Sequence, residues 1–360
     1  MELRTEKIKN LEEELSKTKY NKKSQHHIGL LKAKIARLKE KHARGSSSAT
    51  SGYAIQKTGD ATVVMLGFPS VGKSTLLNKL TNADSPVAPY PFTTLTVIPG
   101  LLEYKHAKIQ ILDIPGIIEG ASEGRGRGRE VLACIRAADM IIILIDVMHP
   151  EQKAIIEKEM YIANIRLNQN RPNVLIKKKN KGGIDIASLV KLVKIDNNTI
   201  KVIMHEFKMF NADVVFKEDV TIDQFIDVIE GGRIYLKAVT LLNKIDLVDN
   251  ANEIKRNFNV DLCISAENGT GINEVKEMIF NRLGFMSIYC KRIGSKADLE
   301  EPLIMKKGQT LNDMCLQMHK DFVKKFKFAR TWGKSVKFDG QKVIKLGHIL
   351  AENDVVELHI

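Results

Sequence analysis

The clearest chemical signal in the chain is the stretch Gly67-Phe-Pro-Ser-Val-Gly-Lys-Ser-Thr75, which fits the pattern G-x-x-x-x-G-K-[ST]. An apolar, strand-like run at 61–66 precedes it, and a helix-like run at 73–80 overlaps its end. In such a turn, backbone N–H groups close around phosphate oxygens, and the positive end of the helix attracts the same anion. We expect Lys73 to reach the β- and γ-phosphates of a nucleotide and Ser74 to bind magnesium. The predicted contacts in this stretch are Gly67, Pro69, Ser70, Val71, Gly72, Lys73, Ser74 and Thr75.

Two later loops are typical of segments that sense a γ-phosphate. Thr93 and Thr94 are adjacent, and one hydroxyl, which we assign to Thr94, would complete the magnesium shell. A strand-like run ends in Asp113-Ile-Pro-Gly116, where Asp113 would hold magnesium through water and the Gly116 N–H would contact the γ-phosphate. The residues expected to act in catalysis are Lys73, Thr93, Thr94 and Gly116.

The residue after Gly116 is Ile117, whereas Ras-like enzymes use a glutamine there to position the attacking water. Isoleucine cannot do this, so intrinsic hydrolysis should be slow or should depend on a monovalent cation or a partner-supplied group. Residues 119–129, rich in glycine and arginine, read as a second switch segment. Their arginines would contact phosphate or RNA, or else serve as charged flexible filler.

A third motif, Asn243-Lys-Ile-Asp246, follows a strand-like run and favours guanine. Asp246 would accept hydrogen bonds from guanine N1–H and N2–H₂, donors that adenine does not present in the same way. Asn243 and the stem of Lys244 would support the base. Ser265 and Ala266 follow another predicted strand, at 260–264, and would brace guanine O6 through a backbone N–H.

Composition limits the classes of function. The length of 360 residues suits two to three domains, and a net charge of +13 indicates an anionic partner, with nucleic acid favoured over a merely soluble basic surface. The four cysteines form no C-x-x-C pair, which suits a reducing compartment. Without a signal-like start or an apolar run long enough to span a membrane, we expect a cytoplasmic protein with no membrane partner and no recognition of DNA sequence.

The spacing between two of the predicted strands indicates an insertion. Between Asp146 and Asn243 lie 96 residues (147 to 242), although connections in α/β units are short. We therefore expect a G domain at 60–166 and 237–287, interrupted by an α+β domain at 167–236. Before the insertion we predict a helix at 150–166. Within it we predict helices at 186–193 and 222–229, a strand at 212–216 and an ambiguous run at 199–205. Its lysines Lys177, Lys178, Lys179 and Lys181 form either a phosphate-contacting loop or a solvated hairpin tip.

The two ends of the chain add further modules. Residues 1–52 read as two helices that bend at 21–25, followed by a flexible linker, and the basic face of the helices is either solvated or laid against RNA phosphates. Residues 288–360 suggest a small β-grasp domain with a helix at 311–326 and strands at 329–332, 335–338 and 355–360. We expect its lysines to face RNA. Its interleaved aromatic residues are expected to pack in the hydrophobic core: Phe322, Phe326, Phe328 and Trp332.

With these motifs in hand, the chain resembles the developmentally regulated GTP-binding proteins, in the Obg-like branch of translation-factor GTPases. The resemblance includes the segments 67–75, 90–95, 113–121, 126–129, 177–183, 210–214, 243–246 and 328–333. It implies a P-loop α/β G domain with an N-terminal helical hairpin, an inserted domain with a ribosomal-protein-like fold and a C-terminal TGS domain. It also implies GTP and GDP as ligands, Mg²⁺, the ribosome and rRNA as partners, and a dedicated regulatory protein. Potassium-stimulated hydrolysis makes K⁺ a further candidate ion, although Ser70 stands where some potassium-dependent GTPases carry asparagine.

Two hypotheses of different classes follow. In the first, the protein is a GTPase switch whose nucleotide state sets its affinity for the ribosome. In the second, it is a ribosome- or RNA-binding scaffold with structural nucleotide and negligible turnover. The residues Lys73, Ser74 and Asp113 favour the first, and Ile117 keeps the second open. Asp246 disfavours an ATPase.

Overall fold

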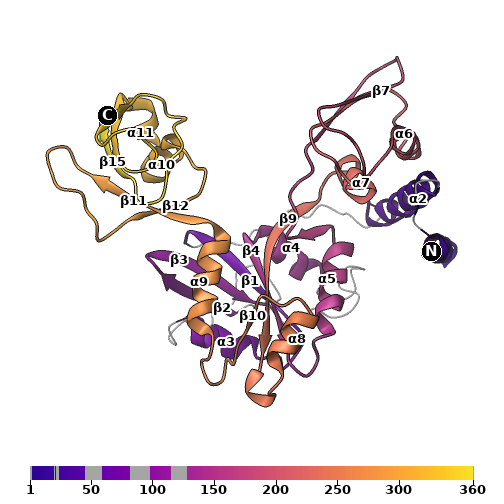
Figure 1. Cartoon of the computed structure of the whole chain (residues 1–360), viewed down its shortest axis with the longest axis horizontal. Helices are drawn as coiled ribbons and strands as arrows, with labels where there is room; N and C mark the ends of the chain where they lie inside the picture. Colours follow the sequence, from indigo (N-terminus) through magenta and orange to yellow (C-terminus); the bar gives the residue numbers. More distant parts are fainter. Residues whose placement is uncertain are drawn as a thin grey trace. The chain divides into compact units, whose positions relative to one another are not determined.

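The structure is a computed structural model that describes residues 2–19, 21, 24–44, 59–81, 98–114 and 128–359. The chain divides into two compact units (Figure 1). The first combines Met1–Gly52 with Asn164–Tyr235, and the second combines Tyr53–Ala163 with Leu236–Ile360. None of the helices in the described ranges has the length and apolar character that a membrane crossing requires.

A mostly parallel sheet organises the second unit. Its described strands follow the order β10-β9-β4-β1-β3-β2, with only β2 antiparallel to its neighbour, and β5 (Ile165–Leu167) pairs with β9. The strands on the main path are β1 (Ala61–Leu66), β2 (Ile98–Tyr104), β3 (Ala107–Asp113), β4 (Met140–Asp146), β9 (Ile234–Asn243) and β10 (Leu262–Cys263).

Helices cover both faces of this sheet, as parallel sheets require. α3 (Lys73–Leu80) and α9 (Ile272–Leu283) share one hydrophobic core with the sheet, while α4 (Gly128–Ala137) contacts β1 and α5 (Gln152–Ile162) contacts β4 (Figure 1). Every residue of β1 and β4 is buried, because side chains on both faces meet helices. A short helix, α8 (Ala251–Asn257), and a 3-10 turn, η2 (Ile245–Leu247), complete the described part of this region.

The predicted helix at 150–166 was too long. α5 ends at Ile162, Asn164 adopts a left-handed conformation with φ 68°, and the chain continues as the short strand β5. The strand predicted at 260–264 shrinks to Leu262–Cys263. The other strands and helices predicted around the nucleotide motifs are confirmed, within a few residues at their ends.

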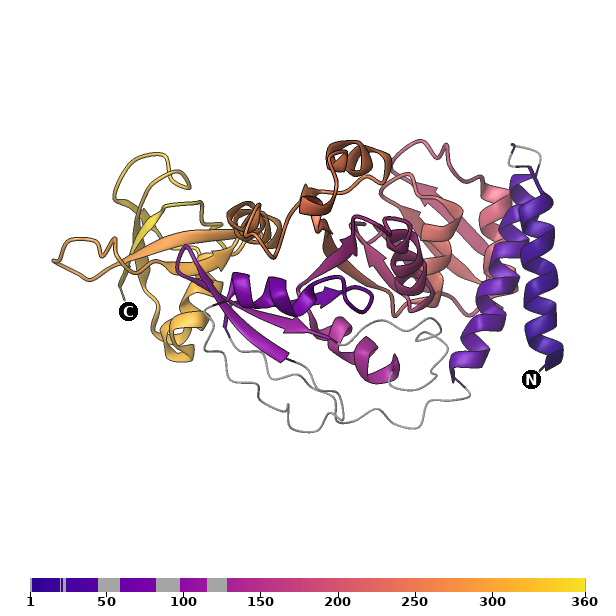
Figure 2. The same ribbon diagram turned by 90° about the horizontal axis from the view of Figure 1, so that it is seen from below.

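The first unit has its own core. A three-stranded sheet in the order β6-β8-β7 packs against α6 and α7, and α2 adds Ile28 and Ala33 to the same core. Figure 2 shows α1 and α2 as an antiparallel pair, which confirms the predicted helical hairpin. Its described elements are α1 (Glu2–Lys17), α2 (Gln25–Arg44), β6 (Val174–Lys178), β7 (Ile184–Ser188), α6 (Asn197–Glu206), β8 (Ala212–Phe216) and α7 (Ile222–Glu230).

The helix predicted at 186–193 was wrong. Residues 184–188 form β7, which pairs in parallel with β8, and the apolar residues beyond it, Leu189 and Val193, are 74% and 73% exposed. The ambiguous run at 199–205 is helix α6, because Asp196 caps it by accepting a hydrogen bond from the Thr199 N–H. The predicted strand at 212–216 and helix at 222–229 are confirmed.

The C-terminal residues of the second unit form a β-grasp sheet in the order β12-β11-β15-β13-β14. Its described elements are β11 (Phe285–Lys291), β12 (Leu303–Lys306), α10 (Leu311–Met318), α11 (Lys320–Lys325), β13 (Phe328–Trp332), β14 (Gln341–Val343) and β15 (Val355–His359). The predicted helix at 311–326 is divided by His319, whose extended backbone ends α10 while its ring accepts a hydrogen bond from Asp321 N–H at the start of α11.

The strand predicted at 335–338 was also wrong. Those residues belong to a loop in which the N–H groups of Ser335 and Lys337 bond to the side chains of Asp354 and Gln341. The strand instead begins at Gln341, after Gly340 turns the chain at φ 76°.

Candidate nucleotide site

The nucleotide motifs meet at one edge of the large sheet. β1, β3, β4 and β9 run in parallel, so their carboxyl ends lie side by side. This edge is where open α/β sheets bind ligands. The phosphate loop follows β1, while Asp113, Asp146 and Asn243 are the last residues of β3, β4 and β9.

Both motif glycines are required by the local geometry. A Cβ on Gly67 would lie 2.5 Å from the carbonyl oxygen of Leu144, far inside normal contact. A Cβ on Gly72 would lie 2.4 Å from Asn243 Nδ2, and its φ of 94° is strained for any other residue. The remaining predicted residues of the loop vary in exposure: Pro69 and Ser70 are exposed, with Ser70 at φ 62°, Val71 is buried, and Thr75 lies in α3.

The Lys73 side chain folds back over the loop that precedes it. Its ammonium donates to the carbonyl oxygens of Phe68 at 3.0 Å and Gly67 at 3.2 Å. Burial lowers the pKa of Lys73, and the nearby carboxylate of Asp113 partly offsets that effect. The ammonium is therefore positioned at the mouth of the phosphate loop.

Ser74 and Asp113 form a pair across two elements. The Ser74 hydroxyl donates to Asp113 Oδ2 at 2.8 Å. Asp113 is only 6% exposed, and its second oxygen, Oδ1, is buried with no hydrogen-bond partner among the described residues. Buried carboxylate oxygens rarely remain unsatisfied. This hydroxyl and carboxylate are oxygen donors of the kind that Mg²⁺ prefers, so the pair fits a magnesium site.

Asn243 links two loops. Its Nδ2 donates to the Val71 carbonyl oxygen at 2.8 Å, and its Oδ1 accepts from the Ala266 N–H at 2.9 Å. The residue is 2% exposed, so both amide groups are used inside the protein. Asn243 thus joins the phosphate loop to the loop predicted to contact the base.

Lys244 is anchored by a residue that the sequence did not single out. Its ammonium bonds Asp146 Oδ2 at 2.7 Å, while the Met148 N–H donates to Asp146 Oδ1 at 2.9 Å. Burial alone would raise the pKa of Asp146, but these hydrogen bonds outweigh it and hold that pKa below its ordinary value. The signal available in the sequence was an aspartate at the end of a buried strand next to the one that carries Asn243.

The other predicted base contacts lie beside this pair. Asp246 is exposed in η2, directly after the β9 strand. Ser265 and Ala266 are buried, and their N–H groups donate to Thr270 O and Asn243 Oδ1. A contact from the Ala266 N–H to guanine O6 would therefore compete with Asn243, and this contact stays a prediction.

Several predicted residues lie outside the described ranges, so their roles stay predictions. These are Thr93, Thr94, Gly116 and Ile117, together with Arg125 and Arg127 of the arginine-rich segment. Arg129 falls in the first turn of α4.

The lysine loop of the first unit is less basic than its composition suggests. Lys179 pairs with Asp213 at 2.7 Å and also with Asp185. These two carboxylates raise the pKa of Lys179. Only its neighbours Lys177, Lys178 and Lys181 keep exposed charges for an anion.

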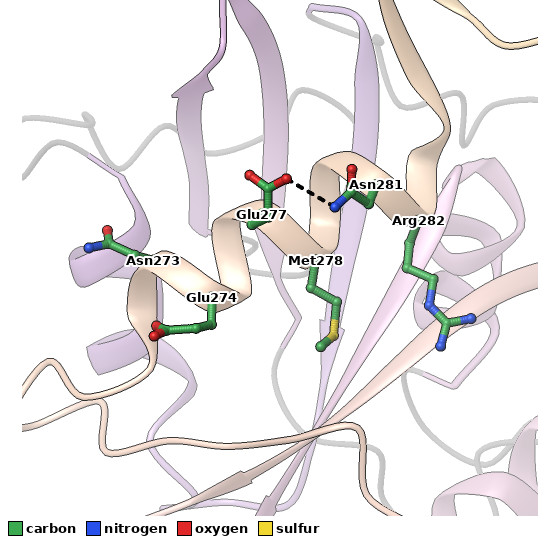
Figure 3. A pocket seen from close by; sticks show the side chains of 6 residues that line it. All are labelled: Asn273, Glu274, Glu277, Met278, Asn281 and Arg282. Atoms are coloured by element: carbon green, nitrogen blue, oxygen red, sulfur yellow. Dashed lines mark hydrogen bonds between the residues drawn. The ribbon is translucent and has the colours of Figure 1, made fainter.

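An open hollow of about 590 Å³ lies along α9 (Figure 3). All the residues that line it come from this one helix: Asn273, Glu274, Glu277, Met278, Asn281 and Arg282. It contains none of the predicted nucleotide contacts, so we do not assign the nucleotide to it.

Comparison with known proteins agrees with this geometry. Residues 62–179 match the family described as 50S ribosome-binding GTPase, and residues 181–285 match the C-terminal region associated with that domain. Residues 286–360 match the TGS domain. Together with the loop after β1, these matches define a P-loop GTPase with a C-terminal TGS domain.

Relatives extend the similarity over the full chain. A GTP-binding protein of Methanocaldococcus jannaschii is 50% identical over 99% of this chain and 92% of its own length. The human developmentally-regulated GTP-binding protein 2 is 42% identical over 98% of each chain, and the Arabidopsis thaliana developmentally-regulated G-protein 3 is 44% identical over the same shares. The chain belongs to the family of developmentally regulated GTP-binding proteins.

Proposed function

We propose that this protein hydrolyses GTP to GDP and phosphate, slowly when alone, and that the bound nucleotide sets its association with the ribosome. The observation that carries the proposal is the Ser74–Asp113 pair, 2.8 Å apart, in which the buried Asp113 Oδ1 has no partner within the part of the chain that the structure describes. A hydroxyl and a carboxylate so placed beside a phosphate loop suit magnesium-dependent phosphoryl transfer.

Ser74 and Asp113 would hold the magnesium ion, with Thr94 as the third candidate. When bound, Mg²⁺ neutralises charge that develops on the phosphate oxygens. Lys73 would move from the carbonyl oxygens of Gly67 and Phe68 to the phosphates, and the Gly116 N–H would contact the γ-phosphate. Thr93 belongs to the same proposed switch segment as Thr94.

Asp246 supplies the preference for guanine in this proposal. Its carboxylate is exposed in η2, shortly after Asn243 and Lys244, where it would accept hydrogen bonds from the two guanine donors. The buried hydrogen bonds of Asn243 support a base pocket of fixed shape. The Asp146–Lys244 contact orients the lysine stem that would line the base.

Ile117 supports the slow intrinsic rate, because an aliphatic side chain cannot orient water. We infer that a monovalent cation such as K⁺, or a group from a partner protein, supplies that role. The net charge of +13 and the name of the matched family support a ribosomal RNA partner and a cytoplasmic location. A dedicated regulatory protein of the family is the proposed protein partner.

Turnover and binding test the proposal together. Phosphate release from GTP should be measurable in potassium and sodium buffers, should rise with ribosomes, and should be lost in Lys73→Ala but kept in Lys79→Ala, which changes an exposed lysine of the same helix. Cosedimentation with ribosomes should differ between GTP and GDP. Equal cosedimentation without turnover would instead support the scaffold with structural nucleotide.

Base preference is a separate test. Asp246→Asn should lower affinity for GDP and raise affinity for xanthosine diphosphate, whereas Asp249→Asn, at a nearby exposed carboxylate, should leave both unchanged. An unaltered preference for GDP in Asp246→Asn would remove that residue from the site.

A further inference from the structure

The β-grasp sheet of the C-terminal domain has two chemically different faces. On the inner face Ala329, Val343 and Val356 are buried in a core that includes Leu311 and Met314 of α10. On the opposite face of the same strands, Arg330 and Lys342 are exposed. Side chains alternate between faces along a strand, so this second face is defined by the residues between the core positions.

Strand pairing lines up four charged residues on the second face. Lys342 of β14 is opposite Arg330 of β13, Arg330 is opposite Glu357 of β15, and Glu357 is beside Lys291 of β11. Residues paired in this way share one face of the sheet. The single acid of this row, Glu357, is bonded to Lys291 at 2.9 Å and to His359 at 2.8 Å. Arg330 and Lys342 therefore face solvent without an acidic partner among the described residues.

Aromatic rings flank this charged row on both sides. Trp332 and Tyr289 are both paired with Val355, which lies two residues from Glu357 along β15 and therefore on the same face. Phe328 and His359 are paired on the other side, with stacked rings whose centroids are 4.2 Å apart. Aromatic residues such as Phe328 and Trp332 were expected in the core, but the register places both on the second face.

The cations and rings already contact each other. The Lys291 ammonium lies 4.3 Å from the centroid of Trp332, and the Lys342 ammonium lies 4.3 Å from that of Phe328. Just beyond Trp332, the loop 333–340 adds Phe338, which is 66% exposed, and the exposed Lys334 and Lys337. Cations beside aromatic rings on an open sheet suit a ligand that carries both phosphates and planar bases.

We propose that this face of the C-terminal sheet binds single-stranded RNA, with Arg330 and Lys342 on phosphates and a base stacked on Trp332 in place of the Lys291 ammonium. Duplex RNA keeps its bases inside the helix and would use the cations alone. The proposal rests on the proposed function, since the ribosome is the expected source of the RNA. A protein partner is disfavoured, because the exposed part of the charged row is cationic rather than apolar.

Trp332 makes the test direct, because it is the single tryptophan of the chain. The full-length protein is titrated with a 12-nucleotide unstructured RNA and with the same RNA in a duplex, while tryptophan emission and RNA anisotropy are recorded. We expect the single strand to quench emission and the duplex to bind without quenching. Arg330→Gln with Lys342→Gln should weaken single-strand binding about tenfold and reduce the salt slope by about 1.4, or about 0.7 per lost phosphate contact.

The matched control removes two lysines from α11, Lys324→Gln with Lys325→Gln, and should leave the titration unchanged. An equal loss in both double variants would overturn the proposal, because net charge alone would then explain binding. Single-strand binding without a change in Trp332 emission would overturn the stacking role. If the double variant lost binding to the family's regulatory protein, and neither RNA bound the parent, the face would be assigned to a protein partner instead. GTP turnover measured in the same variants keeps this outcome separate from the nucleotide site.

Discussion

The Asn243 side chain donates to the Val71 carbonyl oxygen at 2.8 Å, across 172 residues of sequence. Its other end accepts from the Ala266 N–H. One buried amide therefore fixes the distance between the phosphate loop and the base loop. The parts of the site are not independent, and a change at Asn243 should reach both ends of the nucleotide.

Asn243→Ala should weaken binding of GDP by about 30- to 100-fold, because two buried hydrogen bonds of about 1 kcal/mol or more each are lost and their partners are left unsatisfied. Isothermal titration calorimetry with GDP measures this. Asn257→Ala, at the end of α8, serves as the control for loss of an amide. If affinity stayed within twofold of the parent, the linking role would be wrong.

Gly72→Ala should abolish nucleotide binding and lower the free energy of unfolding by about 1–3 kcal/mol, since the new Cβ meets Asn243 at 2.4 Å in a backbone region that suits glycine. Gly294→Ala separates the backbone strain from the steric clash with Asn243, because Gly294 has φ 77° but no atom within 4 Å of the added Cβ. The control should lose stability but keep binding. Urea denaturation and nucleotide titration of both variants provide the comparison.

Asp146→Asn should raise the KM for GTP while kcat stays near that of the parent. The variant removes the charge that orients Lys244, whose stem supports the base in ground state and transition state alike. Steady-state phosphate release checks this, with Asp185→Asn, at an exposed aspartate of the first unit, as a charge-matched control. A fall in kcat at unchanged KM would contradict a role confined to base binding.

Glu277 gives a pH-dependent prediction. Hydrogen bonds from Lys105 at 2.6 Å and from Tyr104 at 2.6 Å lower its pKa to about 2. Because the folded pKa lies below the ordinary value of 4.5, the ion pair contributes stability above about pH 4.5, and this contribution is lost as the pH falls toward 2.

Glu277→Gln should therefore destabilise the protein at pH 7 and converge with the parent only as the pH falls through about 2. Chemical denaturation across this range measures the difference. Glu274→Gln, an exposed carboxylate on the same helix, should show no such convergence. A constant gap between parent and Glu277→Gln at all pH values would show that packing, rather than charge, explains the effect.

The nucleotide site was largely predictable because its residues follow strands with strong apolar runs, and the carboxyl ends of parallel strands converge by topology. Asp146 was missed because its role depends on the neighbouring strand that brings Lys244 beside it. The helix predicted at 186–193 failed because an edge strand with one open face shows weak alternation, and its pairing with β8 decides its conformation. The placement of Trp332 outside the core depended on register, which the sequence did not reveal.

The packing of α2 also has a consequence for biosynthesis. Gln25 Nε2 bonds the Lys194 carbonyl oxygen across 169 residues, and Ile28 and Ala33 lie in a core completed by Ile200 and Phe225. Because translation proceeds from the N-terminus, α2 emerges from the ribosome long before the segment that covers its apolar side. Until residues 195–226 have been made, this side of α2 lacks the partners that cover it in the folded unit.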